Sequence, residues 1–351
     1  KMYNKFGQFY NGGWHQSFDK STYEVINPCN EEVIGNVSNA KPEDVDKALK
    51  SAKMGFDHWK KTPPWERSKV IRKAADLIRE NKEIIAKWIS LEVGKPLKES
   101  LAEVEGSAEI FEWNAEETKR IFGQNIESRF PSTRMNVYYQ PIGVVAALVP
   151  WNFPCVLASR KISTALAAGC SVICKPDTIT PGSVMSLVDI INKAGFPDGA
   201  INLLSGDPAK VSEQLISSDI VKKVSITGST RVGKIILKQA ADKVQRVTME
   251  LSGHAPFIVY EDANIEKAVD TAMAAKYRNN GQVCISPSRF FIHEKIKSKF
   301  QDLFVKKTIK LKMGDAFSNS DLGPITTDKR LSDVEKLSDL KKRKEKIKKF
   351  N

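Results

Sequence analysis

The chain has 351 residues, 41% hydrophobic and 28% charged, a composition typical of a globular protein with up to two domains. No apolar run approaches the ~20 residues that cross a bilayer and no signal peptide is apparent, so a membrane partner is not expected. The net charge of +13 lies partly in lysine runs without interleaved aromatics, so a solvated basic face is favoured over nucleic-acid binding. Five cysteines without a matched CxxC pair, and no HExxH, indicate reduced thiols, a cytoplasmic location and no metal site.

The first third of the chain predicts a helical layer. Residues 1–40 read as short extended pieces separated by turns, and a helix opens at Lys41-Pro42. A second helix is expected from Trp65 until Gly94-Lys95-Pro96 stops it, and a third over 97–120. Few side chains in this layer are expected to carry chemistry.

Residues 124–141 predict a different structure. Mixed polar and apolar residues around Pro131 indicate a two-stranded ribbon. Such a ribbon needs a packing partner to be stable, so a protruding arm that meets another subunit is expected.

From Ile142 the chain alternates between strands and helices, which predicts a parallel sheet covered on both faces. Polar residues follow the ends of these strands, where ligands bind in such sheets. One site is therefore expected around Pro150-Trp151-Asn152, Lys175-Pro176, Thr227-Gly228-Ser229 and Glu250. The strands are expected at 142–149, 171–174, 200–204, 222–226 and 246–250, with helices at 156–168, 182–194, 208–217 and 231–241.

A second, smaller alternating unit begins at Pro256. Strands are expected at 256–260 and 288–293, with helices at 264–276, 294–310 and from Asp328. With two strands, this unit buries little core of its own.

Three residues are candidates for catalysis. Cys284 follows the polar Asn279-Asn280-Gly281-Gln282, which favours a nucleophilic thiol about as much as the usual small buried hydrophobe. Glu250 closes a strand and is either a general base or a solvated carboxylate. Asn152, held between two prolines, is either a preorganised oxyanion donor or a buried turn residue.

Two further features suggest a phosphate-containing cofactor. Thr227 to Gly233 joins a strand to a helix, whose N-terminal N–H groups can bind phosphate. Lys175, fixed by Pro176, could bond a ribose or phosphate. The alternatives are a common glycine turn and a surface lysine.

Together these residues resemble the NAD(P)-dependent aldehyde dehydrogenase superfamily over about residues 8–335. Five motifs occur in family order: PWNFP (150–154), KP (175–176), GSTRVG (228–233), MELSG (249–253) and GQVC (281–284). The resemblance implies a Rossmann-like cofactor domain and a second α/β catalytic domain. It assigns residues 1–123 and 142–250 to the first, 124–141 to an oligomerisation ribbon and 251–337 to a truncated second domain.

The resemblance also implies a mechanism. Cys284 attacks the aldehyde, Asn152 and the Cys284 N–H hold the oxyanion, hydride passes to NAD or NADP, and Glu250 activates water to release the acid. It places the cofactor against the following residues: Trp151, Asn152, Lys175, Thr178, Gly228, Ser229, Gly233 and Leu251. Thr178 stands where NAD-preferring members often have Glu, so both cofactors are left open.

Two arginines narrow the substrate. Arg160 and Arg278 look like the pair that grips the distal carboxylate in succinate-semialdehyde dehydrogenases, and two guanidinium forks suit one carboxylate. Succinate semialdehyde is therefore expected first, with glutarate and 2-oxoglutarate semialdehydes as rivals. Surface salt bridges are the alternative role for each arginine.

The resemblance stops before the end of the chain. No Glu-Ile/Leu-Phe-Gly-Pro motif follows, and residues 338–351 turn to low-complexity lysine, so a C-terminally truncated member with an aberrant tail is expected. Members of the family form homodimers or homotetramers, which the missing part would compromise. The alternatives are an inactive remnant that retains nucleotide binding, and a nucleic-acid binder acting through the tail.

Overall fold

The computed structural model describes residues 3–338. The lysine-rich stretch expected over 338–351 lies outside this range except for Ser338, the last residue of a helix. Within the described part, no helix has both the length and the apolar character that a membrane span requires.

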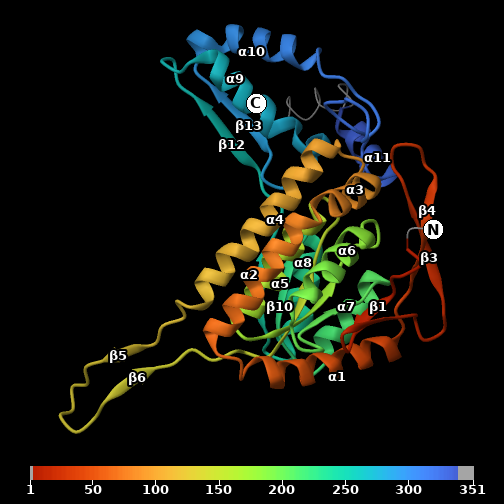
Figure 1. Cartoon of the computed structure of the whole chain (residues 1–351). Helices are drawn as coiled ribbons and strands as arrows, with labels where there is room; N and C mark the ends of the chain where they lie inside the picture. Colours follow the sequence, from red (N-terminus) through yellow and green to blue (C-terminus); the bar gives the residue numbers. More distant parts are fainter. Residues whose placement is uncertain (1–2, 339–351) are drawn as a thin grey trace.

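The centre of the molecule is a seven-stranded sheet in the order β11-β10-β7-β8-β9-β1-β2 (Figure 1). Five neighbouring strands are parallel and buried most deeply at β7 and β8: β7 (Val144–Leu148), β8 (Ser171–Lys175), β9 (Ile201–Leu203), β10 (Val221–Thr227) and β11 (Arg246–Glu250). This confirms the predicted parallel α/β sheet.

Helices cover both faces of the sheet, which explains why β7 and β8 are apolar at nearly every position. One face carries α1 (Pro42–Trp59), α7 (Pro208–Ser217) and α8 (Thr230–Ala241). The other carries α5 (Pro154–Ala167) and α6 (Pro181–Ile191, continued by the 3-10 turn Asn192–Ala194), beneath an outer layer of α2 (Pro64–Glu80), α3 (Lys82–Val93) and α4 (Leu97–Thr118).

Two details differ from the sequence prediction. The single helix expected from Trp65 to Gly94 is two helices, because Asn81 leaves the helical conformation and its side-chain amide donates to the Leu77 carbonyl. The extended pieces near the N-terminus also contribute to the sheet. Here β1 (Gln8–Tyr10) pairs antiparallel with β9 and with β2 (Gly13–His15), while β3 (Thr22–Ile26) and β4 (Val33–Ser38) form a separate hairpin.

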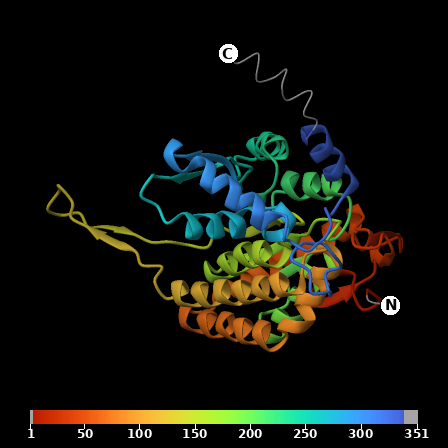
Figure 2. The same ribbon diagram turned by 90° about the horizontal axis from the view of Figure 1, so that it is seen from above.

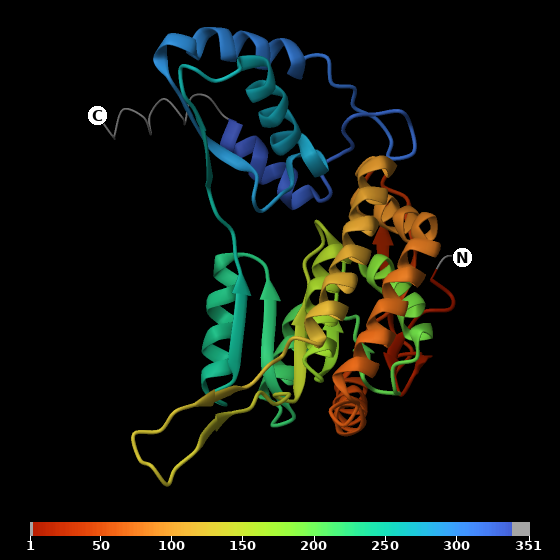
Figure 3. The ribbon, with the colours of Figure 1, turned by 60° about the vertical axis from the view of Figure 1, so that its left-hand side comes forward.

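The second unit lies beyond the carboxyl ends of the parallel strands (Figure 3). Its β12 (Ala255–Val259) and β13 (Pro287–Ile292) pair in parallel, and α9 (Ile265–Tyr277) and α10 (Glu294–Thr308) cover one face. On the other face, Ile258 and Phe291 are opposite each other and 59% and 53% exposed. A final helix, α11 (Asp328–Ser338), follows an irregular segment.

Between α4 and β7 a ribbon projects from the body, as Figures 1 and 2 show. It consists of β5 (Gln124–Ile126) paired antiparallel with β6 (Met135–Val137). Large apolar side chains along it are exposed, among them Phe122, Ile126, Phe130, Met135, Tyr138 and Tyr139. That it meets another subunit stays a prediction.

Candidate active site

The cysteine loop is a sharp turn of unusual backbone conformation. After α9 the short 3-10 turn Arg278–Gly281 contains three successive residues with positive φ, namely Asn279 (50°), Asn280 (56°) and Gly281 (77°). Asparagine and glycine tolerate this left-handed region better than other residues. Cys284 follows three residues after the end of this turn, and its side chain is half-buried.

A segment that we call the strap, residues 312–327, holds this loop from one side. The Asn280 side chain accepts from Gly323 N (2.7 Å) and donates to Pro324 O (2.9 Å). The Gln282 side chain accepts from Thr326 N (3.0 Å) and donates to Thr326 Oγ1 (3.1 Å). Four hydrogen bonds therefore fix the two residues that flank Gly281.

Asn152 meets the cysteine loop from the opposite side. It lies in the turn between β7 and α5, and its Nδ2 donates to Gln282 O (3.1 Å). In return Asn279 Nδ2 donates to Asn152 O (2.8 Å) and to Gln282 O (3.1 Å). The structure thus brings the candidate amide donor to the backbone two residues before Cys284.

Glu250 ends β11, and its backbone carbonyl accepts from Gly228 N (3.1 Å). Its carboxylate pairs with Arg160 Nη1 at 4.0 Å, with both side chains about half exposed, so the pair contributes little stability. The two residues line a cavity of about 500 Å³ together with Lys161. Arg160 and Glu250 therefore line the same cavity.

Lys161, which the sequence did not single out, projects into the same cavity. Burial lowers the pKa of its ammonium to about 8, and the Glu250 carboxylate opposes this effect. Its Nζ donates to Ser225 Oγ (3.1 Å). The one feature of the sequence that could have pointed to Lys161 is its position next to Arg160.

Arg278 has a different neighbourhood from Arg160. Its guanidinium carbon lies 4.8 Å from the centre of the Phe153 ring, and Lys95 Nζ lies 4.2 Å from the same ring centre. Among the contacts of the described residues, none joins the two arginines. Their shared grip on one carboxylate stays a prediction.

The expected cofactor residues gather along the ends of β7, β8, β10 and β11. Lys175 is 3% exposed rather than a surface residue, its Nζ donates to Pro176 O (2.9 Å), and burial lowers its pKa to about 8. Trp151 and Thr178 are half-buried in the turns after β7 and β8. A buried ammonium with donor capacity remaining suits a ribose or phosphate.

The turn into α8 also suits a phosphate group. Ser229 caps the helix by accepting from Val232 N, and a Cβ added at Gly228 would meet only Ile226, at 3.9 Å, so the approach is open. At Gly233 a Cβ would lie 2.8 Å from Leu251 Cδ2, so glycine lets α8 pack closely there. Thr227 Oγ1 is buried without a hydrogen-bond partner. These residues fit a dinucleotide.

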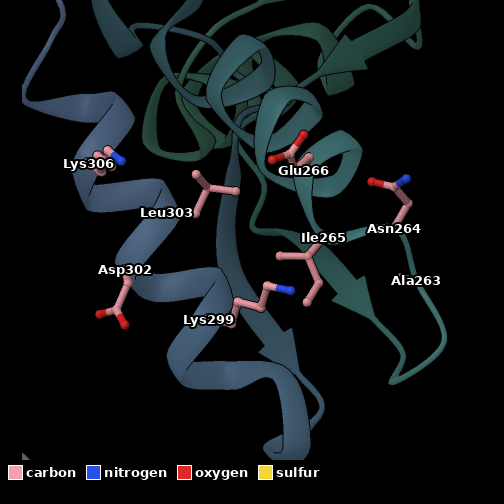
Figure 4. Close-up of a pocket in the computed structure, with 8 residues that line it drawn as sticks. All are labelled: Ala263, Asn264, Ile265, Glu266, Lys299, Asp302, Leu303 and Lys306. Atoms are coloured by element: carbon pink, nitrogen blue, oxygen red, sulfur yellow. The ribbon is translucent and has the colours of Figure 1, made fainter.

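A further hollow lies between α9 and α10 (Figure 4). It measures about 750 Å³ and is lined by Lys299, Lys306, Glu266 and Asp302 around Ile265 and Leu303. Its charges balance, and none of the candidate site residues lines it. It is therefore not assigned to the active site.

Comparison with known sequences decides the family. The profile described as the aldehyde dehydrogenase family matches residues 14–348. The chain belongs to the aldehyde dehydrogenase family. The match confirms the resemblance stated above.

Several curated members of the family are similar to this chain. The mitochondrial succinate-semialdehyde dehydrogenase of Oryza sativa is 41% identical over 326 residues, which cover 93% of this chain and 62% of that protein. The glutarate-semialdehyde dehydrogenase of Pseudomonas putida is 37% identical, with 93% and 68% covered. The NADP(+) succinate-semialdehyde dehydrogenase of Escherichia coli is 36% identical, with the same coverage. The chain therefore spans roughly two thirds of the length of these family members.

Solved aldehyde dehydrogenase structures share the fold. Succinate-semialdehyde dehydrogenase from Burkholderia pseudomallei superposes with a TM-score of 0.92 at 37% identity, covering 94% of this chain and 69% of that one. Betaine aldehyde dehydrogenase from Staphylococcus aureus in complex with NAD+ gives 0.93 at 35% identity, covering 96% and 68%. Both NAD and NADP thus occur among the names of the related proteins.

Proposed function

We propose that the chain carries the site of an NAD(P)-dependent dehydrogenase that oxidises a semialdehyde with a distal carboxylate to the acid. Succinate semialdehyde is the substrate favoured first. The observation that supports this most is the hydrogen bond from Asn152 Nδ2 to Gln282 O, 3.1 Å long, because it sets an amide donor beside the thiol loop.

In this proposal the Cys284 thiolate forms a bond to the aldehyde carbon. The second N–H of the Asn152 amide and the Cys284 backbone N–H stabilise the resulting oxyanion. A nicotinamide cofactor held at the strand ends would supply the hydride acceptor, and loss of the hydride from the adduct would leave a thioester on Cys284. Glu250 then takes a proton from water, the hydroxide attacks the thioester, and the acid leaves as the thiolate is restored.

The residues proposed to hold the cofactor lie after the carboxyl ends of the parallel strands, and Lys175 among them is buried. Lys175 and Thr178 would hold the adenosine ribose, and the N-terminus of α8 with Gly228, Ser229 and Gly233 would hold the pyrophosphate. Trp151 and Leu251 would line the same groove. Thr178 carries no charge to repel a 2′-phosphate, so NAD and NADP are both proposed.

The distal carboxylate is proposed to bind Arg160 and Arg278. Arg160 lines the cavity beside Glu250, and Arg278 extends from the loop that carries Cys284. Glutarate and 2-oxoglutarate semialdehydes are the alternative substrates, since they carry the same distal group on a different chain.

The exposed ribbon β5–β6 supports a second proposal, that the protein forms a homodimer or homotetramer. Apolar side chains such as Ile126, Phe130 and Met135 would be buried against another copy.

The test of the activity is direct. The purified chain is mixed with succinate semialdehyde and NAD+ or NADP+, and absorbance of the reduced nicotinamide is followed. Cys284→Ala should abolish the rise, whereas Cys29→Ala, a half-buried thiol outside the site, should retain it. Equal rates in the parent and Cys284→Ala would contradict the proposal.

A nucleotide-binding protein without turnover is the second candidate. It is favoured by the position of Lys175, Gly228 and Ser229 on the central sheet, where they require nothing from the cysteine loop. Two measurements test this candidate: fluorescence titration with NADH or NADPH, and alkylation of Cys284 with and without succinate semialdehyde. Nucleotide binding without protection of Cys284 would favour this candidate over the enzyme.

A further inference from the structure

We infer that two carboxylates on one face of α4, Glu99 and Glu103, are positioning residues that hold the thiol loop and the oxyanion amide in register. This inference rests on the proposed function of Cys284 and Asn152. It also corrects the expectation that the helical first third of the chain has little to do with chemistry.

Glu103 fixes the amide side. Its side chain is 1% exposed, and its Oε1 accepts from Cys155 N (2.9 Å) and Val156 N (3.1 Å). These N–H groups open α5 and have no partner within the helix. Asn152 lies just before them, so the carboxylate fixes the turn that presents its amide.

A buried cation pairs with Glu103 and orients it. Lys95 is fully buried, and its Nζ bonds Glu103 Oε2. The same Nζ lies 4.2 Å from the centre of the Phe153 ring, next to Asn152. Removal of one partner alone would leave an unpaired buried charge and would destabilise the fold.

Glu99 fixes the thiol side. It lies four residues before Glu103, hence on the same helix face. Its Oε2 accepts from Asn279 N at 2.6 Å, and Asn279 is the first of the left-handed residues in the cysteine loop. The bond stabilises a backbone conformation that the chain rarely adopts. Burial raises the pKa of the Glu99 carboxyl, and the bond from Asn279 N opposes this effect.

The two sides also bond each other, which closes the network. The Asn152 and Asn279 side chains both donate to Gln282 O, and Asn279 also donates to Asn152 O. The Phe153 ring contacts both Lys95 and Arg278. A rigid helix therefore sets the separation between the donor and the attacking sulfur. In general, misplacing catalytic groups by about 1 Å can cost roughly 100-fold in rate.

The first test separates positioning from mere stability at Glu99. Glu99→Ala should lower kcat at least tenfold while KM changes less than threefold, and Glu99→Gln, which keeps an acceptor, should restore most of kcat. Glu117→Ala on the exposed face of the same helix is the matched control and should leave kcat unchanged. Equal kcat in the Glu99→Ala variant and the parent would overturn the role of Glu99.

The second test addresses Glu103 without leaving a buried charge. The double variant Lys95→Met with Glu103→Gln keeps an acceptor for Cys155 N and Val156 N, so kcat should stay within about fivefold of the parent. Lys95→Met with Glu103→Leu removes the acceptor, and kcat should fall at least tenfold at unchanged circular dichroism. Retained kcat in the Leu variant would overturn the role of Glu103.

A third measurement does not depend on turnover, so it separates this inference from the proposed activity. Iodoacetamide labelling is read by mass spectrometry at Cys284, with the buried Cys170 as the reporter of unfolding. Glu99→Ala should speed Cys284 labelling at least threefold at constant Cys170 labelling. Unchanged Cys284 labelling would overturn the inference even in an active chain, whereas faster labelling supports it even in an inactive one.

Discussion

Glu92 illustrates how much one buried carboxylate can organise. Its side chain is fully buried. Its carboxylate oxygens accept hydrogen bonds from Tyr3 Oη (2.5 Å), Gly182 N (2.7 Å) and Ser183 N (2.7 Å). It thereby joins the N-terminal segment to the start of α6. Burial nevertheless raises the pKa of Glu92 to about 7, since desolvation outweighs these bonds.

A raised carboxyl pKa makes stability depend on pH. The Glu92 carboxyl has a pKa of about 4.3 in the unfolded chain and about 7 in the folded protein, so the folded state binds the proton more tightly. The stability that the bound proton adds is therefore fully present below about pH 4.3 and is lost as the pH rises to about 7. The free energy of unfolding should fall by on the order of 3 kcal/mol from this group. Urea unfolding at pH 5 and pH 8 should show a smaller difference in Glu92→Gln than in the parent; an identical difference would contradict the prediction.

Arg160 pairs with Glu250 at 4.0 Å. If a substrate carboxylate replaces that partner, Arg160→Met should lower kcat/KM for succinate semialdehyde at least tenfold more than for butanal, which lacks the carboxylate. Steady-state kinetics with both aldehydes measures this. Arg246→Met, at the start of the strand β11 that Glu250 ends, is the control because Arg246 does not line the cavity. Equal losses with the two aldehydes would rule out the carboxylate contact.

The sequence pointed to the residues at strand ends and in the polar loop, because their surroundings differ from those of core or surface. It missed Lys95, Glu99, Glu103 and Lys161 because charged residues in helices and turns are normally expected on the solvated surface. Only the packing of α4 against α5 and the cysteine loop turns Glu99 and Glu103 inward.

At the scale of elements, the helix and strand alternation could be predicted because buried strands are uniformly apolar and the helices carry apolar stripes. The break at Asn81 and the pairing of β1 with β9 could not. The first depends on one side-chain bond to Leu77, and the second joins three-residue strands far apart in the chain.

Two glycines in helix interiors should respond in opposite ways to alanine. At Gly55 of α1 a Cβ would lie 2.0 Å from the Gly199 carbonyl carbon, whereas at Gly106 of α4 it would meet only Val156, at 3.8 Å. Gly55→Ala should destabilise by about 2 kcal/mol or more through overpacking. Gly106→Ala should stabilise by roughly 0.5–1 kcal/mol through lower unfolded-state entropy. Chemical denaturation checks both, and the same sign for the two would contradict the packing.

At the scale of the whole molecule, the central sheet and the second unit differ in how they are covered. The central sheet has helices on both faces, but β12–β13 has them on one. Its outer face presents Ile258 and Phe291. On the covered face the Phe257 and Phe290 rings contact each other at a tilt, and Phe290 meets Phe304 of α10 edge-on. The sequence could predict the two strands but not which side of them lacks a cover, since both faces are apolar.

An exposed apolar pair favours self-association. Ile258→Thr with Phe291→Thr should reduce light scattering of concentrated protein and leave the melting temperature nearly unchanged. Phe257→Thr, on the covered face, should instead lower the melting temperature. Unchanged scattering in the double variant would show that this face does not drive association.

The left-handed turn before Cys284 has a consequence for chemical ageing. Asn280 precedes Gly281, and an Asn-Gly step normally deamidates fast because the glycine nitrogen reaches the asparagine side chain without hindrance. Here that side-chain amide is held at both ends by Gly323 and Pro324. Intact Asn280 in stored protein therefore reports that the strap is in place, and its conversion to aspartate marks the molecules in which the loop has opened.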